Sequence, residues 1–347
     1  MADKKRFGII GCGVIAYTHA TSIRYLAREA ELYAVCDIIP EKADEFAKRH
    51  GAEKVYYDYR QLLADPRVDI VCICVPSGLH GEVAVAAAQA GKNMVIEKPM
   101  EITPERIAGI QRAVREAGVK AQCIFQRRTM PAAIAVREAV LSGKLGRICM
   151  ASAELKYYRD QVYYNSAGWR GTWELDGGGA LMNQGVHGID LIVWMLGGGI
   201  KSVYAKTRTL ARKIAVEDTA SLLIEMDSGC LLTIQGATIA YPGFSTGFAV
   251  YGENGTVAFN DEGVLEWKFI DEKNAPPLPQ LDGNVVGGAG DPRAIGSMGH
   301  VKLLDDLIHA IDEDRPPMIP PDMADDAVKV ICAAYESSRL GRAVSLD

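Results

Sequence analysis

The sequence predicts an α/β protein: an N-terminal domain with a doubly wound parallel sheet, followed by an α+β domain with an open, mostly antiparallel sheet. Through the first third of the chain, strand and helix patterns alternate, which a parallel sheet requires. After about residue 128, long stretches of alternating apolar and polar residues take over, as in antiparallel strands. The 347 residues suit two domains of ordinary size. We expect domains at residues 1–127 and 128–347, with the last helices free to pack back on the first domain.

The chain opens with a short apolar strand at residues 5–10 and a Gly-x-Gly-x-x-Ala turn that leads into a helix. Gly11 permits the tight turn, and Gly13 lets the backbone approach a pyrophosphate. The backbone amides of Val14 and Ile15 lie at the start of the helix, where they can bind an anion. Such a turn is typical of a Rossmann domain, although glycine-rich turns also occur for purely structural reasons.

Asp37 follows the second expected strand, residues 32–36. It stands where the dinucleotide-binding pattern places a carboxylate for ribose hydroxyls, and the alternative is a solvated strand end. Ile38 comes next, and no Arg or Ser stands beside it to bind a 2′-phosphate. The sequence therefore favours NAD over NADP as the cofactor.

The other elements of the first domain follow from apolar periodicity and cap residues. Helices are expected at 40–50, 59–64, 82–90 and 104–117, and strands at 68–75, 93–96 and 120–125. Thr103 caps the last of these helices. Ligands in such sheets bind outside the carboxyl ends of the strands, where two of the loops lie. The loop residues expected beside the cofactor are Pro76, His80, Glu97 and Lys98.

Antiparallel strands and a few helices are expected in the second domain. The strand patterns cover 148–158, 200–209, 219–226, 231–240, 248–251 and 256–260. The helix patterns cover 131–142, 180–196, 300–313 and 322–339. Residues 271–299 are rich in Pro and Gly and long for a structureless loop, which indicates a lid or an arm that contacts another subunit.

Composition argues against several classes of partner. The 38 Lys and Arg residues are outnumbered by 44 Asp and Glu, so the formal charge is −6 and there is no basic surface for nucleic acid. The eight cysteines are scattered without a Cys-x-x-Cys pair, which indicates reduced thiols in the cytoplasm. No segment approaches the ~18 apolar residues of a membrane span, and none resembles a signal peptide. Because neither Cys nor His residues show metal-ligand spacing, we expect no metal site.

A helix after a triple glycine carries the most informative residues of the second domain. It is expected over residues 180–196, directly after Gly177–Gly179. At about 100° per residue, one face of this helix carries Asn183, His187, Asp190 and Trp194. A lone helical His is more often a satisfied structural residue. Here the shared polar face, and the glycines that let another group approach closely, favour a functional His187.

Three motifs together resemble the glucose–fructose oxidoreductase/inositol dehydrogenase (Gfo/Idh/MocA) family: the glycine-rich start, Glu97-Lys98-Pro99, and the triple glycine followed by Asn183 and His187. The resemblance covers essentially the whole chain. It implies a Rossmann domain and an α/β domain whose open sheet is used for dimer and tetramer contacts. It also implies a tightly held nicotinamide cofactor and substrates that are sugars, cyclitols or nucleotide sugars.

The resemblance also implies roles for single residues. Lys98 is expected near the nicotinamide and the reacting hydroxyl, with a cis peptide bond before Pro99, and His187 is expected to be the acid/base. Many members have Asp where this chain has Asn183, which can orient a substrate but cannot pass on a proton. His187 would take the proton of a ring hydroxyl while Lys98 favours the alkoxide and the hydride leaves for the nicotinamide. Further candidates to bind the sugar, each with a structural alternative, are Arg127, Tyr158, Trp169 and Arg170.

Three functions fit these motifs. The first is an NAD-dependent oxidoreductase acting on a secondary ring hydroxyl of a sugar, glycoside, cyclitol or nucleotide sugar, with C3 favoured. The second is an NAD-cofactored enzyme that cleaves a glycoside through transient oxidation at C3 and elimination. The third is a non-catalytic NAD-binding regulator, which the presence of both Lys98 and His187 disfavours. Because the strands from 219 to 240 carry little charge on an open sheet, we expect a homodimer or homotetramer.

Overall fold

The computed structural model describes residues 4–279 and 296–346 of the chain, which forms two compact units. The first unit joins Met1–Gln126 to Gly296–Asp325, and the second joins Arg127–Ile295 to Asp326–Asp347. The sequence suggested one boundary, at 127/128, and left the last helices free to pack back on the first domain. The return of 296–325 to the first unit depends on tertiary contacts that no local pattern reveals. Most of the expected lid or arm at 271–299 lies outside the described residues, so its role stays a prediction.

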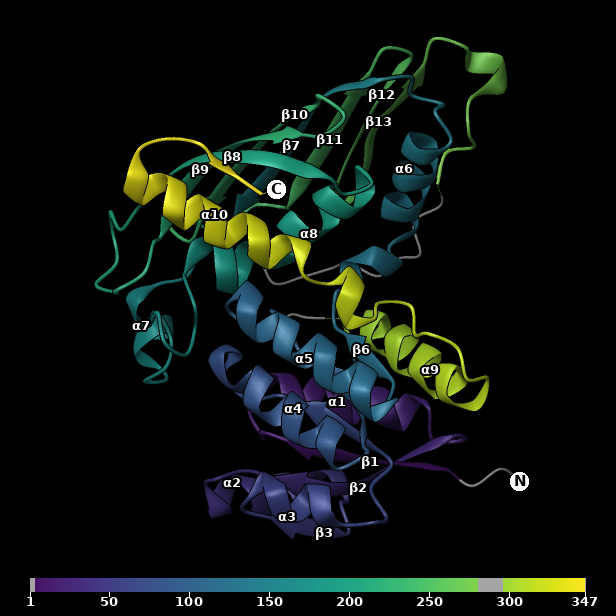
Figure 1. The fold of residues 1–347 in the computed structure, drawn as a ribbon, viewed down its shortest axis with the longest axis vertical. Coiled ribbons are helices and arrows are strands. Elements are labelled where there is room, and N and C mark those ends of the chain that lie inside the picture. The colour runs from purple at the N-terminus through teal and green to yellow at the C-terminus, as the bar shows by residue number, and fades with distance from the viewer. Residues whose placement is uncertain (1–3, 280–295, 347) are drawn as a thin grey trace. The chain divides into compact units, whose positions relative to one another are not determined.

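The first unit contains a six-stranded parallel sheet with the order β3-β2-β1-β4-β5-β6 (Figure 1). Its strands are β1 (Lys5–Ile10), β2 (Ala30–Cys36), β3 (Lys54–Tyr56), β4 (Ile70–Ile73), β5 (Asn93–Ile96) and β6 (Ala121–Cys123). The strand order reverses between β1 and β4, and sheets of this kind bind ligands at the carboxyl ends of the strands around that point. The expected Rossmann domain is confirmed. Only β3 escaped the sequence reasoning, because a half-buried strand of three residues shows no clear alternation.

Local sequence signals set the ends of the helices in this unit. The helical segments are α1 (Val14–Tyr25), α2 (Pro40–His50), α3 (Tyr59–Ala64), η1 (Ser77–Leu79), α4 (His80–Gln89), α5 (Pro104–Ala117), α9 (Met298–Asp312) and η5 (Pro321–Met323). Thr103 accepts a hydrogen bond from the Arg106 N–H at 3.4 Å at the start of α5, and Gly118, with φ of 67°, ends it. The late helix α9 packs against α1, which explains why 296–325 belongs to this unit.

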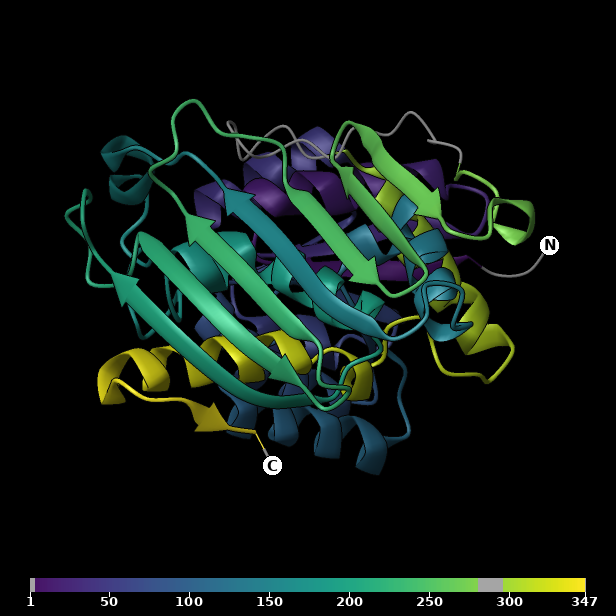
Figure 2. The same ribbon diagram turned by 90° about the horizontal axis from the view of Figure 1, so that it is seen from above.

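The second unit contains an eight-stranded sheet with the order β13-β12-β11-β7-β10-β9-β8-β14 (Figure 2). Its strands are β7 (Ile148–Lys156), β8 (Ile200–Arg208), β9 (Thr219–Met226), β10 (Leu231–Ala237), β11 (Gly247–Gly252), β12 (Gly255–Asn260), β13 (Gly263–Phe269) and β14 (Val344–Ser345). In the part of the chain that the structure describes, β7 and β10 pair in parallel and the other neighbours pair antiparallel. The expected mostly antiparallel sheet is confirmed. It also contains β13 and β14, which the sequence patterns did not predict.

One face of this sheet is buried and the other is open. Along β9 and β10 the side chains at even positions, such as Ile224 and Ile234, are buried, and those at odd positions are mostly exposed. The helices α8 (Val186–Met195) and α10 (Asp326–Leu340) pack on the sheet at β7 and β8. On the open face, the large apolar side chains at least one-third exposed are Met150, Tyr204, Leu223, Leu231 and Tyr251.

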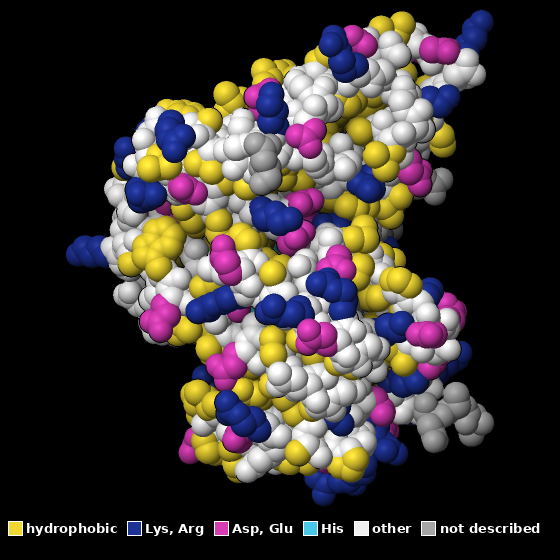
Figure 3. All heavy atoms as spheres, viewed as in Figure 1, with side chains coloured by type: hydrophobic (Ala, Val, Ile, Leu, Met, Phe, Trp, Pro, Cys, Tyr) yellow, Lys and Arg dark blue, Asp and Glu magenta, His cyan; other side chains and the backbone are white. Residues whose placement is uncertain are grey.

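The remaining helical segments of the second unit are short. They are η2 (Gln126–Thr129, which starts in the first unit), α6 (Pro131–Leu141), α7 (Gln161–Asn165), the π-helix η3 (Ala180–Gly185) and η4 (Glu272–Asn274). The helix expected over 180–196 therefore begins with a wide π turn before α8. No helix in the described ranges is both long and apolar enough to cross a bilayer. On the face drawn in Figure 3, basic and acidic side chains are interspersed.

Candidate active site

The turn between β1 and α1 fits a pyrophosphate. Gly11 has a φ of +93°, which other residues rarely adopt, and a Cβ there would lie 2.6 Å from the carbonyl oxygen of Cys74. Gly13 is the N-cap residue of α1 and supplies no side-chain cap. Nothing lies within 4 Å of where its Cβ would be. The start of α1 is therefore open at Gly13, as an anion site at a helix N-terminus requires.

Asp37 lies directly after β2, beside this turn. Its Oδ2 accepts a hydrogen bond from the N–H of Cys12 at 2.8 Å, and its Oδ1 accepts one from Ile39 at 2.9 Å. These bonds fix the carboxylate at the carboxyl ends of β1 and β2. The remaining lone pairs can accept bonds from ribose hydroxyls. The residues of this region therefore fit NAD, and the contact of Asp37 with the ribose stays a prediction.

Pro76 lies in the loop after β4, and His80 is the first residue of α4. The His80 ring is 1 % exposed, with its Nδ1 2.7 Å from the carbonyl oxygen of Pro99 and its Nε2 2.9 Å from that of Val75. Pro76 comes just before the 3-10 turn that leads to His80. His80 thus joins the loop after β4 to the loop after β5. Its packing role is clear from these contacts, and its contact with the cofactor stays a prediction.

Glu97, which directly follows β5, is bound by two histidines that sequence reasoning did not connect with it. Its carboxylate is 4 % exposed, and Oε1 lies 2.8 Å from Nε2 of His19 and 3.2 Å from Nε2 of His300. Within the described residues, the Nδ1 atoms of both rings are buried without a hydrogen-bond partner. This pattern fits rings that carry their proton on Nε2 and donate it to Glu97, since a bare nitrogen costs less to bury unpaired than an N–H.

Glu97, His19 and His300 form a buried triad in the first unit, and the Glu97 carboxylate in it is ionised. Burial alone would raise the pKa of Glu97, but the hydrogen bonds from His19 and His300 hold that pKa well below its ordinary value. Burial lowers the pKa of His19 by more than Glu97 raises it. The three side chains are also close enough to hold a metal ion. Two N–H donors aimed at one carboxylate oxygen already account for the cluster.

Lys98 projects from the backbone that this triad fixes. Its N–H donates to Oε2 of Glu97 at 3.1 Å, and its peptide bond to Pro99 is cis, as the family resemblance implied. Lys98 is half-buried, whereas Pro99 and Glu97 on either side are buried. The structure therefore presents Lys98 at the carboxyl end of β5 on a firmly held loop.

In the second unit, Asn183 lies in a hydrogen-bond network. Its Nδ2 donates to Oδ1 of Asp176, and its Oδ1 accepts from Gln184 and, at 3.5 Å, from the hydroxyl of Tyr163. Asp176 is 1 % exposed, and its Oδ2 accepts the N–H of Gly171 at 2.8 Å. The amide of Asn183 is thus held in one orientation. Asp176 directly precedes the triple glycine in the sequence, but only the contact reveals what it does.

His187 is half-buried near the start of α8, a helix that is anchored on two sides. Gly188 packs on β7, where a Cβ would lie 2.2 Å from Cδ2 of Leu155. Asp190 is 2 % exposed and accepts two hydrogen bonds from Arg128, at 2.8 and 2.6 Å. Asp190 lies three residues after His187 on α8, and its carboxylate is buried against the guanidinium of Arg128 instead of being exposed on the helix surface.

Two of the sugar-binding candidates lie near the Asn183 network. The guanidinium of Arg170 is 4.1 Å from the centroid of the Tyr163 ring and 5.0 Å from that of Trp169. Tyr163 in turn reaches Asn183. Arg170 and Asn183 thus meet at Tyr163, which sequence reasoning missed, and Trp169 packs on Arg170.

Arg127 and Tyr158 have other partners. Arg127 is 5 % exposed and donates to Asp261 at 2.7 Å and to Thr246 at 3.2 Å. Tyr158 packs edge-on against Tyr241, with ring centroids 5.1 Å apart. A substrate would have to compete with these partners, and a role for either residue in binding stays a prediction.

Two family models match the chain: an oxidoreductase family with an NAD-binding Rossmann fold over residues 5–125 and a GFO/IDH/MocA C-terminal domain over 133–258. The crystal structure of the WlbA dehydrogenase from Bordetella pertussis, in complex with NADH and UDP-GlcNAcA, is 33% identical, covers 99% of both chains and has a TM-score of 0.88. Inositol 2-dehydrogenase from Rhizobium meliloti is 28% identical over 280 residues, 79% of this chain and 81% of that protein. A scyllo-inositol 2-dehydrogenase (NAD(+)) from Bacillus subtilis is 27% identical over 261 residues, 74% of each chain. This chain therefore belongs to the Gfo/Idh/MocA family of NAD-dependent oxidoreductases.

Proposed function

We propose that this oxidoreductase transfers a hydride between NAD and a secondary ring hydroxyl of a sugar, glycoside, cyclitol or nucleotide sugar, with C3 as the favoured carbon. The observation that carries the proposal is the network in which Asp176 and Tyr163 fix the amide of Asn183, shortly before the half-buried His187. A fixed amide and an imidazole on one helical segment are suited to bind a hydroxyl and to exchange its proton.

The names of the relatives support this class of substrate. The WlbA structure contains UDP-GlcNAcA, and the dehydrogenases from Rhizobium meliloti and Bacillus subtilis are named for inositols. A nucleotide sugar and an inositol share secondary hydroxyls on a six-membered ring. We therefore propose such a hydroxyl as the reacting group here.

In the proposed oxidation, His187 takes the hydroxyl proton as general base, a role that a histidine can perform near neutral pH without much tuning. The ammonium group of Lys98 favours the developing alkoxide by its charge. Asn183 orients the hydroxyl but cannot take up a proton. NAD, when bound, supplies the acceptor for the hydride, and reduction is the reverse. The residues proposed to hold NAD are Gly11, Gly13, Val14, Ile15, Asp37, Pro76, His80, Glu97 and Lys98.

A stopped-flow screen tests the proposal. The protein is mixed with NAD and with nucleotide sugars, inositols, monosaccharides and glycosides, and the absorbance of NADH is followed. We expect NADH to form with one of these classes, and a product whose new carbonyl group, trapped with borodeuteride, carries deuterium at C3. No NADH formation with any class, and no NADH consumption with the corresponding ketones, would contradict the proposal. Release of an aglycone without accumulated NADH would indicate glycoside cleavage instead.

We also propose that the protein is a homodimer or homotetramer. On the open face of the second sheet, Leu231 of β10 pairs with Met150 of β7, which pairs with Tyr251 of β11. These side chains are 48 %, 48 % and 36 % exposed. They form an apolar row across three adjacent strands, and contiguous apolar patches of this kind mark contact surfaces.

A further inference from the structure

Other groups of the protein come very close to the backbone of the triple glycine. A Cβ on Gly179 would lie 1.9 Å from the carbonyl oxygen of Glu217, and a Cβ on Gly178 would lie 2.0 Å from the hydroxyl oxygen of Tyr335. Glu217 precedes β9 and is 3 % exposed, and Tyr335 comes from α10. Gly178 and Gly179 are therefore explained by the approach of Tyr335 and Glu217, without a ligand.

Glu217 satisfies the backbone at the start of the helical segment. Its Oε2 accepts the N–H of Gly179 at 3.0 Å, and its Oε1 accepts the N–H of Leu181 at 2.8 Å. Its carbonyl oxygen accepts the N–H of Ala180 at 3.0 Å. The first N–H groups of a helix have no partner within the helix, so Glu217 acts as a cap supplied from a distant segment. It ties down three successive residues.

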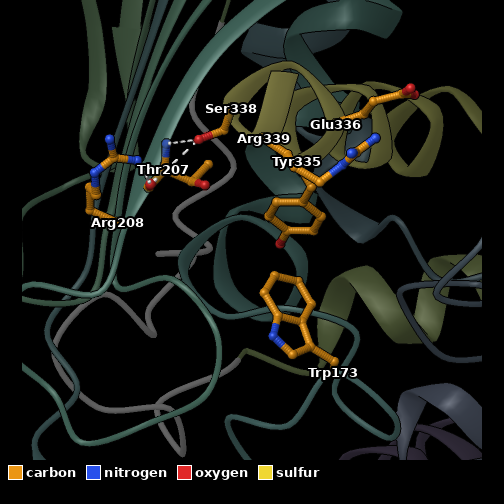
Figure 4. A pocket seen from close by; sticks show the side chains of 7 residues that line it. All are labelled: Trp173, Thr207, Arg208, Tyr335, Glu336, Ser338 and Arg339. Carbon is orange, nitrogen blue, oxygen red and sulfur yellow. Dashed lines mark hydrogen bonds between the residues drawn. The ribbon is translucent and has the colours of Figure 1, made fainter. Parts of the chain in front are cut away.

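Tyr335 completes this contact from α10. Its hydroxyl donates to Oε1 of Glu217 at 3.0 Å, and its ring packs edge-on against Trp173, with centroids 5.0 Å apart and planes at 88°. Figure 4 shows Tyr335 reaching from α10 toward Trp173 where both line a pocket of about 570 Å³. The Glu217 carboxylate is therefore held from two elements.

The capped segment sets the direction of the site residues. It is π-helical from Ala180 to Gly185, and α8 follows. A π turn is wider than an α turn, so it changes the rotation of every side chain that follows. Asn183 lies within this turn, and His187 lies just after it. The position of the cap thus fixes the angle at which both residues project.

We propose that Glu217 is the positioning residue of this segment: by capping residues 179–181 it holds Asn183 and His187 at the angle at which they act on the substrate hydroxyl. The inference rests on the proposed function, in which His187 exchanges the hydroxyl proton. Glu217 acts through the helix backbone.

The pKa of Glu217 is shifted toward neutral pH, where enzyme activity can be measured. Burial raises its pKa to about 7, although the N–H groups of Leu181 and Gly179 and the hydroxyl of Tyr335 oppose the shift. Burial and the nearby Glu217 raise the pKa of Tyr335 well above its ordinary value, so this hydroxyl remains a donor, with Asp176 and Cys332 as the other ionisable groups acting on it. The rate profile of the wild-type enzyme should therefore contain a titration near neutral pH that a glutamine cannot reproduce.

The test compares Glu217→Gln with Glu336→Gln. The first change places an amide NH₂ against backbone N–H donors. The second is the same change at an exposed residue of α10 that Figure 4 shows pointing away from Tyr335. For Glu217→Gln we expect kcat to fall about 10²-fold, the loss that a misplacement of ~1 Å can cause. NADH binding, measured by fluorescence, should be unchanged. The component of the pH profile that depends on Glu217 should disappear, while the component that depends on the proposed base His187 remains. Hydrogen–deuterium exchange over residues 177–190 should speed up, and Glu336→Gln should match the wild type.

Tyr335→Phe provides a second, milder variant, because it keeps the carboxylate and removes one donor. It should also lower kcat, but by a smaller factor than Glu217→Gln does. A Glu217→Gln enzyme with wild-type kcat and pH profile would overturn the proposal, and so would a loss of kcat without faster exchange over 177–190. If Glu217→Gln does not fold, an unchanged kcat and unchanged exchange in Tyr335→Phe overturn it. His187→Ala separates the two proposals: if it keeps its turnover, the proposed function itself fails.

Discussion

Asn183 donates its side-chain amide to the buried carboxylate of Asp176, which is 1 % exposed. The resemblance to the family implied Asp at the position of Asn183. In this chain a second carboxylate there would face the first, and two like charges in contact destabilise each other. The amide and Asp176 therefore form a matched pair in this protein.

The first prediction follows from this pair. Asn183→Asp places two carboxylates in contact, so one of them keeps a proton to higher pH and the pair titrates with a raised apparent pKa. The acid limb of the kcat profile should move up by about 1 unit or more. The double variant with Asp176→Asn restores one amide and one carboxylate and should bring the limb back toward the wild type. An acid limb that stays in place in the single variant would contradict this account.

Asn183→Ala tests the orienting role. The change removes a hydrogen-bonding group that does not titrate, so binding of the ground state and of the transition state should weaken together. We expect KM for the substrate to rise while kcat changes little. Initial rates over a range of substrate concentrations measure both constants, and a loss confined to kcat would assign Asn183 to the chemical step.

Cofactor choice depends on Asp37. A 2′-phosphate about 4 Å from this carboxylate would meet a repulsion of roughly 4 kcal/mol per charge pair at an effective dielectric of ~20. Because Cys12 and Ile39 hold both carboxylate oxygens, the side chain cannot easily turn away. NADP should bind far more weakly than NAD, and Asp37→Ser should reduce this difference in affinity. Equal affinity of the wild type for both cofactors in a fluorescence titration would exclude this role.

Lys98→Met and His187→Ala test the proton chemistry. Each should lower kcat by roughly 10²-fold or more, as is typical for lost acid–base groups. NAD affinity should change far less than kcat, because the pyrophosphate is proposed to bind at the Gly11–Ala16 turn, whereas Lys98 is proposed to lie at the nicotinamide end. Matched controls are Lys48→Met and His309→Ala, at exposed positions of α2 and α9. Turnover near the wild-type value in both test variants would revive the non-catalytic NAD-binding function.

Assembly should depend on the open face of the second sheet. Met150→Lys and Leu231→Lys place charges in the apolar row, so subunits should separate. Light scattering at micromolar concentration should show a multiple of 37.5 kDa for the wild type and a smaller particle for the variants. Leu210→Lys is the control, at a 67 % exposed residue in the loop after β8. A wild-type particle of one chain's mass would contradict the proposed oligomer.

Acid stability of the first unit should depend on Asp65. Burial alone would raise its pKa, but the N–H of Arg67 and the hydroxyls of Tyr56 and Tyr33 lower it from 3.8 to about 2. The carboxylate therefore stabilises the fold above its unfolded pKa, and this contribution is lost as pH falls from about 4 toward about 2. Asp65→Asn should lower the melting temperature at neutral pH. The difference in melting temperature between the variant and the wild type should become smaller as the pH falls toward about 2. A constant difference across this range would exclude the mechanism.

The sequence by itself determined the elements whose signals are local. The helices at 40–50 and 104–117 occur where they were predicted, since Pro40 and Thr103 start them and glycines end them. Six strands of the second sheet were found because each buries one face, whereas β13, the two-residue β14 and the short β3 of the first sheet were not. The candidate residues Gly11, Asp37, Lys98 and His187 were visible because each follows a strand or lies in a motif whose spacing is local.

Tertiary structure alone decided how those residues are held. Glu97 meets His19 and His300, which are 78 and 203 residues away along the chain. Glu217 caps a helix start 36 to 38 residues earlier, and this cap accompanies the π turn before His187. Backbone periodicity is set by neighbouring residues, and a sequence pattern records it. The partner of a buried charge is set by the folding of distant segments against one another, because a carboxylate removed from water must find its donors wherever the fold brings them.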